Sequence, residues 1–525
     1  MNKIVLTLNG QQIEVYEGTT ILEAARLNGV KIPTLCYLKD TNEIGACRMC
    51  IVKVKGTKTH LPACATIATD GMEVLTDCQE LFKARKMTLE LICSEHRFNC
   101  EICPRYSDCE LHALMSVYGV DENKLEFRNP AKGLDCDETA THMIRDKSKC
   151  VQCRRCVSSC TRIQSVNILG VFGRGFSTQV GPVLPLAQTD CVGCGQCIAA
   201  CPTGALYEKD DTRQIWRAIN SKQKRVVGVV SPAVYAQLGE SFFDGVKKNS
   251  VGKTAALLRR IGFDLVYDLD ETSTELVSFL SRKVKNRLEG DDNLPIISSG
   301  CPGWAKCCKN LYPEMANNTL GNSSPALEFG RDHRIEIARQ LGVSESDVVI
   351  VSISTCTAQK QEAAQSENRG LVDVCITARE LAAMARRACV SRFTARQIWQ
   401  KLPEEEYDNL PDQCGAALSV SGGITEAVLR NISGSTPEFS MNQHGVREAT
   451  VEVCGKKIKV AAVTGLGNAQ NLMKSIKTGK ASYDLVEIMA CQGGCLNGGG
   501  TPRQHASVYN FADIKTAFAQ ETLMK

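Results

Sequence analysis

The first thirty residues alternate between apolar and polar positions in a pattern that predicts a small sheet followed by a helix. The segment KIVLTLNGQQIEVYEG contains two alternating apolar runs on either side of Asn9-Gly10, which favours a tight β-hairpin. Thr20 and Glu23 have the spacing of a capping box for a helix over TILEAARLNG, and Asn28-Gly29 should end that helix. We therefore expect a packed sheet-helix frame at the start of the chain.

Beyond residue 210 the pattern changes to short continuous apolar runs that alternate with amphipathic helical segments, which predicts an α/β domain. The candidate strands are RVVGVVS, FDLVYDLD, LPIISS, DVVIVSIS, VDVCIT, KVAAVTG and DLVEIMA. Several of them end where unusual residues begin, at Ser231-Pro232, Gly300-Cys301, Cys356 and Cys491. Because ligands of such domains bind at the carboxyl ends of parallel strands, these positions are candidates for a site.

The composition narrows the possible functions. A chain of 525 residues exceeds a single hydrophobic core, so about three to four units are expected. Lys and Arg number 62 against 58 Asp and Glu, and this near balance gives no reason to expect nucleic acid or a membrane as partner. There is no apolar run of roughly 18 residues and no signal peptide, so we expect a soluble cytoplasmic protein. In that compartment the 28 cysteines are available as metal ligands rather than as disulfides.

A first group of cysteines follows the predicted sheet-helix frame, in CYLKDTNEIGACRMC and LPAC. Its members are Cys36, Cys47, Cys50 and Cys64. Soft thiolate sets also bind zinc, and a Cys-x-x-Cys pair alone would not decide between the metals, but the spacing favours iron. GACRMC resembles the tight loop of plant-type ferredoxins, with a longer gap before it, and is similar to the 2Fe-2S domain of complex I and of many hydrogenases. The resemblance implies a 2Fe-2S cluster.

The segment HRFNCEICPRYSDC offers one imidazole and three thiols, His96, Cys100, Cys103 and Cys109. Its spacing resembles that of a cubane in the same complex I and hydrogenase group. A lone histidine is usually structural, but this one precedes three closely spaced cysteines, and neutral imidazole is a competent iron ligand. The resemblance therefore implies a 4Fe-4S cluster with His96 among its ligands.

CVQCRRCVSSC and CVGCGQCIAACP form an internal repeat of the bacterial ferredoxin pattern, in which the fourth cysteine of each run serves the other cluster. One predicted 4Fe-4S set is Cys150, Cys153, Cys156 and Cys201. The other is Cys191, Cys194, Cys197 and Cys160. No Gly-rich nucleotide-binding loop accompanies these clusters, so this part of the chain is predicted to carry electrons that another subunit or carrier supplies.

The segment EIMACQGGCLNGGGTP adds two cysteines and a glycine run that permits close backbone approach to a cofactor. With SGCPGW, STCTAQKQEA, TARELA, SGGITEAVLR and TGLGNA it closely resembles the catalytic domain of the iron-only (di-iron) hydrogenases, in the same order. The resemblance implies a fifth cubane, held by Cys301, Cys356, Cys491 and Cys495. In hydrogenases the last of these thiolates also bridges to a di-iron unit.

The sequence departs from the family at residues that would touch the di-iron unit. Gly300 replaces a proton-relaying cysteine, Ser354-Thr355 replaces a Met-Pro pair, and Gln359 replaces a lysine that holds a cyanide ligand. Lys360 is one residue away and should point elsewhere. Glu362 and Met489 match family positions, but they are equally well explained as a solvated carboxylate and a core methionine. We therefore expect no di-iron subcluster.

These resemblances imply a multidomain α/β and α+β protein, in which ferredoxin-like iron-sulfur modules precede a hydrogenase-like α/β domain of the catalytic type. The expected domains are a 2Fe-2S domain at 1–78, a 4Fe-4S segment with one histidine and three cysteines as ligands at 79–126, a dicluster ferredoxin domain at 127–210 and a hydrogenase-like domain at 211–525. The expected cofactors are one 2Fe-2S cluster and four 4Fe-4S clusters, with no catalytic residue in the chain itself.

The chain most resembles the hydrogenase-like subunit of the Sporomusa-type Nfn (Stn) electron-bifurcating transhydrogenases. That resemblance implies an electron-relay subunit of an oxidoreductase complex that couples NAD(P)H to ferredoxin, with FMN or FAD and NAD(P) on the partner subunits. The implied partners are a complex I-like FMN and iron-sulfur subunit, a small 2Fe-2S subunit, a glutamate-synthase-like flavoprotein and soluble ferredoxin. Two alternatives stay open, an active or sensory iron-only hydrogenase and a C-terminal domain that is only a docking scaffold.

Overall fold

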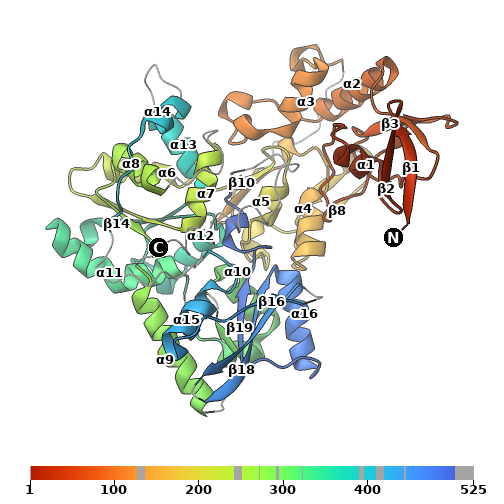
Figure 1. The fold of residues 1–525 in the computed structure, drawn as a ribbon. Helices are drawn as coiled ribbons and strands as arrows, with labels where there is room; N and C mark the ends of the chain where they lie inside the picture. The colour runs from red at the N-terminus through yellow and green to blue at the C-terminus, as the bar shows by residue number, and fades with distance from the viewer. Residues whose placement is uncertain are drawn as a thin grey trace.

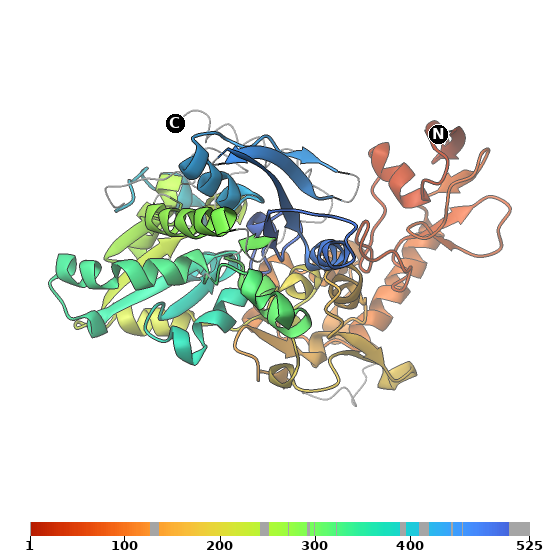
Figure 2. The ribbon, with the colours of Figure 1, turned by 90° about the horizontal axis from the view of Figure 1, so that it is seen from below.

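The structure is a computed structural model, and it describes residues 2–126, 136–241, 251–270, 272–290, 295–298, 300–321, 323–388, 395–408, 419–442, 445–453 and 455–502. Three parts follow one another along the chain, and the middle one lies between the other two in both views (Figures 1 and 2). The domain boundary expected after residue 126 adjoins residues outside the described set.

The N-terminal part is a five-stranded sheet in the order β2-β1-β5-β3-β4 with one helix on it. Its elements are β1 (Lys3–Leu8), β2 (Gln11–Tyr16), α1 (Ile21–Leu27), β3 (Ile51–Val54), β4 (Leu61–Pro62) and β5 (Glu73–Leu75). The predicted hairpin is confirmed, since β1 and β2 pair antiparallel and both Asn9 and Gly10 have positive φ. The Thr20 hydroxyl accepts from the Glu23 backbone N–H at 3.3 Å, which confirms the start of α1.

The middle part consists of short helices and small sheets around two cysteine-rich loops. Its helices are α2 (Gln79–Ser94), α3 (Glu110–Tyr118), α4 (Arg155–Ser158) and α5 (Gln196–Ala200). Its strands are β6 (Cys136–Asp137), β7 (Met143–Asp146), β8 (Gly170–Phe172), β9 (Gln179–Gly181) and β10 (Leu206–Glu208). The repeat in the sequence is also a repeat in conformation, because Arg154 and Gly195 occupy the same place in the two runs and both have φ in the left-handed region, 62° and 66°.

The C-terminal part contains two sheets instead of one. The first has the order β12-β11-β14-β15 and is parallel throughout; its strands are β11 (Arg225–Val230), β12 (Leu265–Asp268), β14 (Val348–Ser354) and β15 (Val374–Thr377). The second has the order β13-β19-β18-β17-β16; its strands are β13 (Ile296–Ser298), β16 (Ser440–Met441), β17 (Arg447–Val453), β18 (Lys456–Thr464) and β19 (Leu485–Met489). All the candidate strands of the sequence are present, which confirms the predicted α/β fold.

Helices cover these sheets and complete two buried cores. They are α6 (Thr212–Ile219), α7 (Pro232–Ser241), α8 (Val251–Ile261), α9 (Thr274–Gly290), α10 (Pro302–Leu311), α11 (Pro325–Leu341), α12 (Ala358–Ala363), α13 (Ala378–Ala388), α14 (Ala395–Lys401), α15 (Gly423–Ser433) and α16 (Leu466–Lys477). No helix among the described residues has the length and apolar character needed to cross a bilayer. The carboxyl ends of β13, β14 and β19 point to the junction of the two sheets, where Cys301, Cys356, Cys491 and Cys495 lie.

Candidate iron-sulfur sites

The first cysteine set lies on the loops beside the N-terminal sheet, and the structure brings all four members together. The sulfur atoms of Cys50 and Cys64 are 3.2 Å apart, and the backbone N–H of Cys47 donates to Cys36 Sγ at 3.5 Å. Cys36, Cys50 and Cys64 are buried in the core of this part. Four soft donors on a rigid frame fit a 2Fe-2S cluster.

The second set spans the end of α2 and the start of α3. His96 follows α2 and its ring packs edge-on against Phe98, with ring centroids 4.9 Å apart. Cys103 interacts electrostatically with both Cys100 and Cys109, so the three thiols are neighbours. Ligation by His96 stays a prediction.

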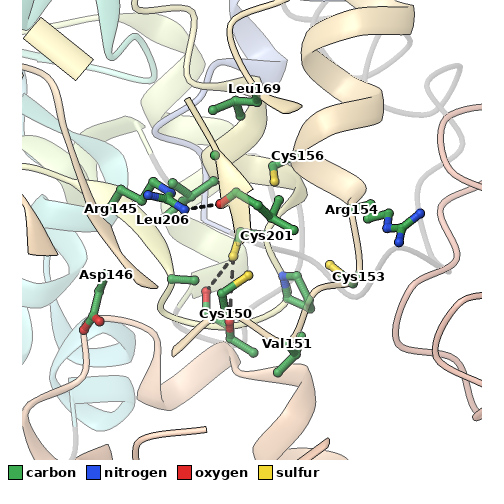
Figure 3. Close-up of a pocket in the computed structure, with 15 residues that line it drawn as sticks. Arg145, Asp146, Cys150, Val151, Cys153, Arg154, Cys156, Leu169, Cys201 and Leu206 are labelled. Carbon is green, nitrogen blue, oxygen red and sulfur yellow. Dashed lines mark hydrogen bonds between the residues drawn. The ribbon is translucent and has the colours of Figure 1, made fainter. Parts of the chain in front are cut away.

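The third set lines one cavity, which we call the Cys150 cavity (Figure 3). Its thiols come from the first cysteine run and, for one of them, from the end of the second run: Cys150, Cys153, Cys156 and Cys201. Figure 3 shows their sulfur atoms turned toward a common space. The backbone N–H of Gln152 donates to Cys150 Sγ at 3.4 Å, and burial raises the pKa of the Cys153 thiol to about 12. Binding of metal here must therefore expel protons.

The fourth set lines a second cavity, which we call the Cys191 cavity: Cys160, Cys191, Cys194 and Cys197. The structure thus groups the thiols with the fourth cysteine of each run exchanged, as the ferredoxin pattern predicts. The backbone N–H of Ile168 donates to Cys160 Sγ at 3.4 Å. His142 Nε2 lies 3.6 Å from Cys191 Sγ. Burial, reinforced by Lys306 and Lys360, lowers the pKa of His142 to about 4.

The fifth set lines the Cys301 cavity, at the junction of the two C-terminal sheets: Cys301, Cys356, Cys491 and Cys495. Cys301 directly precedes α10, Cys356 follows β14, and Cys491 follows β19. The backbone N–H of Ala490 donates to Cys301 Sγ at 3.3 Å. Three distant segments thus deliver thiols to one point because parallel strands end there.

The Cys301 cavity extends past its thiols, and Gly300, Gln359 and Met489 line the extension. The Gln359 side-chain oxygen accepts hydrogen bonds from the hydroxyls of Ser352 and Ser354, each at 2.9 Å. A neutral amide held by two serines thus occupies the position where the resemblance to hydrogenases predicts a lysine.

Lys360, the next residue, is not among the residues that line the Cys301 cavity. Its ammonium binds Asp211 at 2.6 Å and Glu380 at 2.9 Å, and it also donates to the carbonyls of Lys209 and Cys375. Although burial opposes the charge, these carboxylates hold the pKa of Lys360 above its ordinary value. Its charge is therefore used in a buried ion network beside the cavity and is absent from the cavity lining.

The cysteine sets are linked by direct contacts between their loops. Asn42 is fully buried, and its amide donates to the carbonyls of Cys36 at 2.7 Å and Cys153 at 3.1 Å, which joins the first set to the Cys150 cavity. A Cβ atom on Gly204 would lie 2.5 Å from Cys103 Sγ, so the second set lies against the chain that follows Cys201.

Further along, the Cys150 and Cys191 cavities are neighbours, because Cys156 and Cys197 interact electrostatically. Cys194 interacts in the same way with Cys301 and Cys491. The backbones of the two parts approach closely here, since a Cβ atom on Gly195 would lie 2.8 Å from the Cα of Gly499.

Two contacts were not found by sequence reasoning. Asn42 lies inside the loop between two predicted ligands, but an asparagine in a loop carries no signal of what it will bind. His142 lies far from Cys191 in sequence and belongs to no motif. Both contacts depend on how the loops pack, which spacing does not encode.

The donor chemistry fits iron-sulfur clusters. The Cys150, Cys191 and Cys301 cavities each present four thiols, and in each a backbone N–H donates to one sulfur. No group of three or more His, Cys, Asp or Glu side chains in the described ranges is arranged to hold a single metal ion. When bound, iron-sulfur clusters supply one-electron transfer.

The fold and the cysteine sets together define an oxidoreductase subunit with iron-sulfur modules and a hydrogenase-type α/β domain. Residues 224–499 match the iron only hydrogenase large subunit, C-terminal domain family, and the chain belongs to this family. Three further families match upstream. They are the 2Fe-2S iron-sulfur cluster binding domain at 1–79, the NADH-ubiquinone oxidoreductase-G iron-sulfur binding region at 85–124 and the 4Fe-4S dicluster domain at 149–205.

Among curated proteins, the chain is 36% identical to the NADP-reducing hydrogenase subunit HndD of Solidesulfovibrio fructosivorans, with 97% of this chain and 90% of that protein covered. It is 32% identical to iron hydrogenase 1 of Clostridium pasteurianum, with 97% and 91% covered. It is also 32% identical to the NADH-ubiquinone oxidoreductase 75 kDa subunit of Reclinomonas americana, with 38% of this chain and 29% of that protein covered.

Proposed function

We propose that this chain is the iron-sulfur relay subunit of a flavin-based, electron-bifurcating NAD(P)H and ferredoxin transhydrogenase complex. The five sets described above would hold one 2Fe-2S cluster and four 4Fe-4S clusters. The chain's own residues bind the clusters, hold them close together and exclude water from the thiolates. Oxidation or reduction of nucleotide and ferredoxin takes place on partner subunits and carriers.

The order of contacts between the sets supports a relay. The first and second sets both border the Cys150 cavity, which borders the Cys191 cavity, and that in turn borders the Cys301 cavity. Electrons can therefore pass through the molecule between neighbouring sets without leaving its interior. No described helix could carry this path across a bilayer.

The composition of the cavity extension carries the proposal that no di-iron subcluster is bound. Gly300 has no side chain to pass a proton, and Gln359 brings no positive charge toward an anionic cofactor. Lys360, the nearest cation in sequence, is held by Asp211 and Glu380. A cubane on the four thiols needs none of these missing groups.

The names of two relatives support some of the proposed partners. HndD and the 75 kDa relative are each named as a subunit of an enzyme that uses NADP or NADH. We propose a complex I-like FMN and iron-sulfur subunit, a small 2Fe-2S subunit and a glutamate-synthase-like flavoprotein as partners, with soluble ferredoxin as carrier. Reconstitution with these subunits should give NAD(P)H-dependent ferredoxin reduction, and loss of that activity on omission of this chain would support the relay.

Infrared spectroscopy tests the absence of the di-iron unit. The protein is co-expressed with hydrogenase maturation enzymes, purified anaerobically and examined where metal-bound carbon monoxide and cyanide absorb. We expect no bands, together with iron and sulfide contents that correspond to five clusters. An authentic iron-only hydrogenase matured in the same cells is the control. Bands in this protein would contradict the proposal.

An iron-only hydrogenase is the second candidate function. It is favoured by the relatives, two of which are named as hydrogenases, and by Met489 in the cavity wall. Glu362 also fits, because burial raises its pKa to about 7, which suits a group that passes protons. Dihydrogen-dependent reduction of a viologen dye by the matured protein would establish this candidate.

A further inference from the structure

His142 occupies a position that the relay as described so far does not use. The residue lies just before β7, its side chain is buried with 1% exposed, and its Nε2 lies 3.6 Å from Cys191 Sγ. Within the described chain no carboxylate pairs with the ring, and Nδ1 has no hydrogen-bond partner. A buried polar ring aimed at a single sulfur atom calls for a reason, because such a group costs stability unless it is hydrogen-bonded.

The surroundings decide which nitrogen carries the proton. A neutral imidazole has one N–H donor and one acceptor nitrogen. A proton on Nδ1 would have no acceptor, whereas a proton on Nε2 faces a sulfur that is negatively charged when it binds metal. The Nε2–H tautomer is therefore the stable one, and Cys191 accepts its hydrogen bond.

The two cysteine runs offer an internal comparison, because Cys150 and Cys191 are the first cysteines of equivalent repeats. Each sulfur accepts from the backbone N–H two residues later, that of Gln152 and that of Gly193. Cys191 has the imidazole in addition. The nearby Lys306 also interacts favourably with negative charge on Cys191.

We propose that His142 donates a hydrogen bond from Nε2–H to the Cys191 thiolate and thereby raises the reduction potential of the cubane in the Cys191 cavity. The inference rests on the proposed function, since it requires a cubane there. Reduction adds negative charge that spreads onto the thiolates, and a donor to sulfur stabilises the reduced form more than the oxidised form. His142 is thus a positioning residue: it acts through Cys191 and stabilises the added negative charge at the central step of the relay.

The placement gives the hydrogen bond a role. The Cys191 cavity lies between the Cys150 and Cys301 cavities, so an electron that moves through neighbouring sets between the N-terminal part and the Cys301 cavity passes it. A raised potential at this point lets the cubane retain an electron while its neighbours exchange theirs with partners. A chain that exchanges electrons with several carriers needs a cluster that can store an electron between transfers.

Redox titration of the full chain, followed by electron paramagnetic resonance, tests the proposal. The signal of the Cys191 cubane is assigned by its loss in Cys191→Ala. His142→Leu removes the donor, and His142→Gln keeps an N–H₂ group at a similar reach. We expect the midpoint potential of this cubane to fall in His142→Leu and to return toward the wild-type value in His142→Gln, with the other clusters unchanged. The buried His333, which packs on Phe329 in α11, provides the control His333→Leu.

Each remaining outcome has a fixed meaning. If the Leu variant keeps the cubane at the wild-type potential, the inference is wrong. If the wild-type chain itself lacks the cubane signal, the proposed function is wrong, and this inference, which rests on it, is wrong as well. If the Leu variant loses the cubane, the proposed hydrogen bond is tested in wild-type protein that contains ¹⁵N-labelled histidine. The hydrogen bond is supported if the signal of the Cys191 cubane shows a nitrogen coupling in wild-type protein and this coupling is absent in His142→Gln. If wild-type protein shows no such coupling, the proposed hydrogen bond is wrong.

Discussion

The Cys191 cavity and the Cys301 cavity each present four thiols but are built in different ways. Three thiols of the Cys191 cavity come from one short run and the fourth from its repeat. The Cys301 cavity gathers its thiols from the ends of strands in two different sheets, and it continues into a space lined by Gly300, Gln359 and Met489. The Cys191 cavity is lined mainly by residues in and beside its two cysteine runs, whereas the Cys301 cavity is also lined by residues at the ends of strands and helices from two sheets. On the proposed function, this hydrogenase fold keeps the thiols of a cubane but lacks the side chains that would serve a second cofactor.

The largest expected effect concerns the thiols of the Cys301 cavity. Cys301→Ala should remove one whole cubane, about four iron atoms per chain, because a 4Fe-4S cluster normally needs its four protein ligands. Iron and sulfide analysis, together with the visible absorption of the clusters, measures the loss.

Cys307 provides a matched control for that prediction. It lies in α10, is 1% exposed and packs in the apolar core beside Cys301. Cys307→Ala should keep all the iron and cost only about 1 kcal/mol of stability through the small cavity it leaves. Equal iron in Cys301→Ala and the wild type would show that the thiols of this cavity hold no cluster, and the docking-scaffold alternative would then apply to the C-terminal part.

The comparison of the two cavities also shows which ligand sets and strands could be predicted from the sequence. Spacing alone groups Cys160 with Cys191, Cys194 and Cys197, because a repeated ferredoxin run is a local pattern. The strands that end at Cys301, Cys356 and Cys491 were visible as apolar runs, but the separation of the Cys356 strand from the other two into a second sheet was not, because strand pairing is a long-range property. The antiparallel β16 and β17 were also missed. β17 alternates buried and exposed residues at the side of its sheet, a weaker signal than the continuous apolar runs.

The second prediction concerns a buried ion pair at the junction between the two cavities. The guanidinium of Arg379 binds Glu208 through two nitrogens, at 2.9 and 2.8 Å, and also donates to the carbonyls of Thr501 and Gly499. Burial opposes ionisation of Glu208, but Arg379 holds its pKa below the ordinary value. Arg379→Ala leaves that carboxylate buried and unpaired, which should lower the free energy of unfolding by about 3–5 kcal/mol. Anaerobic denaturant unfolding measures the loss.

Two controls sharpen this prediction. Replacing both partners, as in Glu208→Leu with Arg379→Met, should recover much of the stability, because no lone charge stays buried. Lys3→Ala removes the exposed pair with Glu14 and should cost less than about 1 kcal/mol. An Arg379→Ala loss as small as that of Lys3→Ala would mean that this ion pair does not hold the two parts together.

The third prediction concerns the junction at the other end of the relay. Asn42→Leu deprives the buried carbonyls of Cys36 and Cys153 of their donor and the Ser158 hydroxyl of its acceptor. Unsatisfied buried polar groups of this kind should cost about 2–3 kcal/mol in total. We also expect faster hydrogen exchange in the loop from Cys36 to Cys47. Asn28→Ala, which removes a side-chain bond at the end of α1, is the control and should leave that loop unchanged.

The smallest expected effect is a pH dependence of stability that comes from Glu362, which interacts electrostatically with Cys301. Glu362 accepts a hydrogen bond from the Ser324 backbone N–H on one oxygen, while its other oxygen is buried with no hydrogen-bond partner among the described residues. Burial raises the pKa of Glu362 from 4.5 to about 7. The folded chain therefore binds a proton between these values that the unfolded chain has already released. The contribution of Glu362 to stability should be most favourable below pH 4.5 and should fall as the pH rises toward 7.

Glu362→Gln removes this proton and should flatten the dependence. Relative to wild type, the variant should become more stable as the pH is raised from about 5 to about 8, the interval in which linkage acts on a carboxyl with a raised pKa. Unfolding midpoints at several pH values measure the difference. Glu367→Gln is the control, because that carboxylate is exposed and its pKa is lowered by backbone and Ser366 hydrogen bonds. If the two variants follow the same trend, Glu362 is solvated, and the hydrogenase candidate loses the proton-passing group that favoured it.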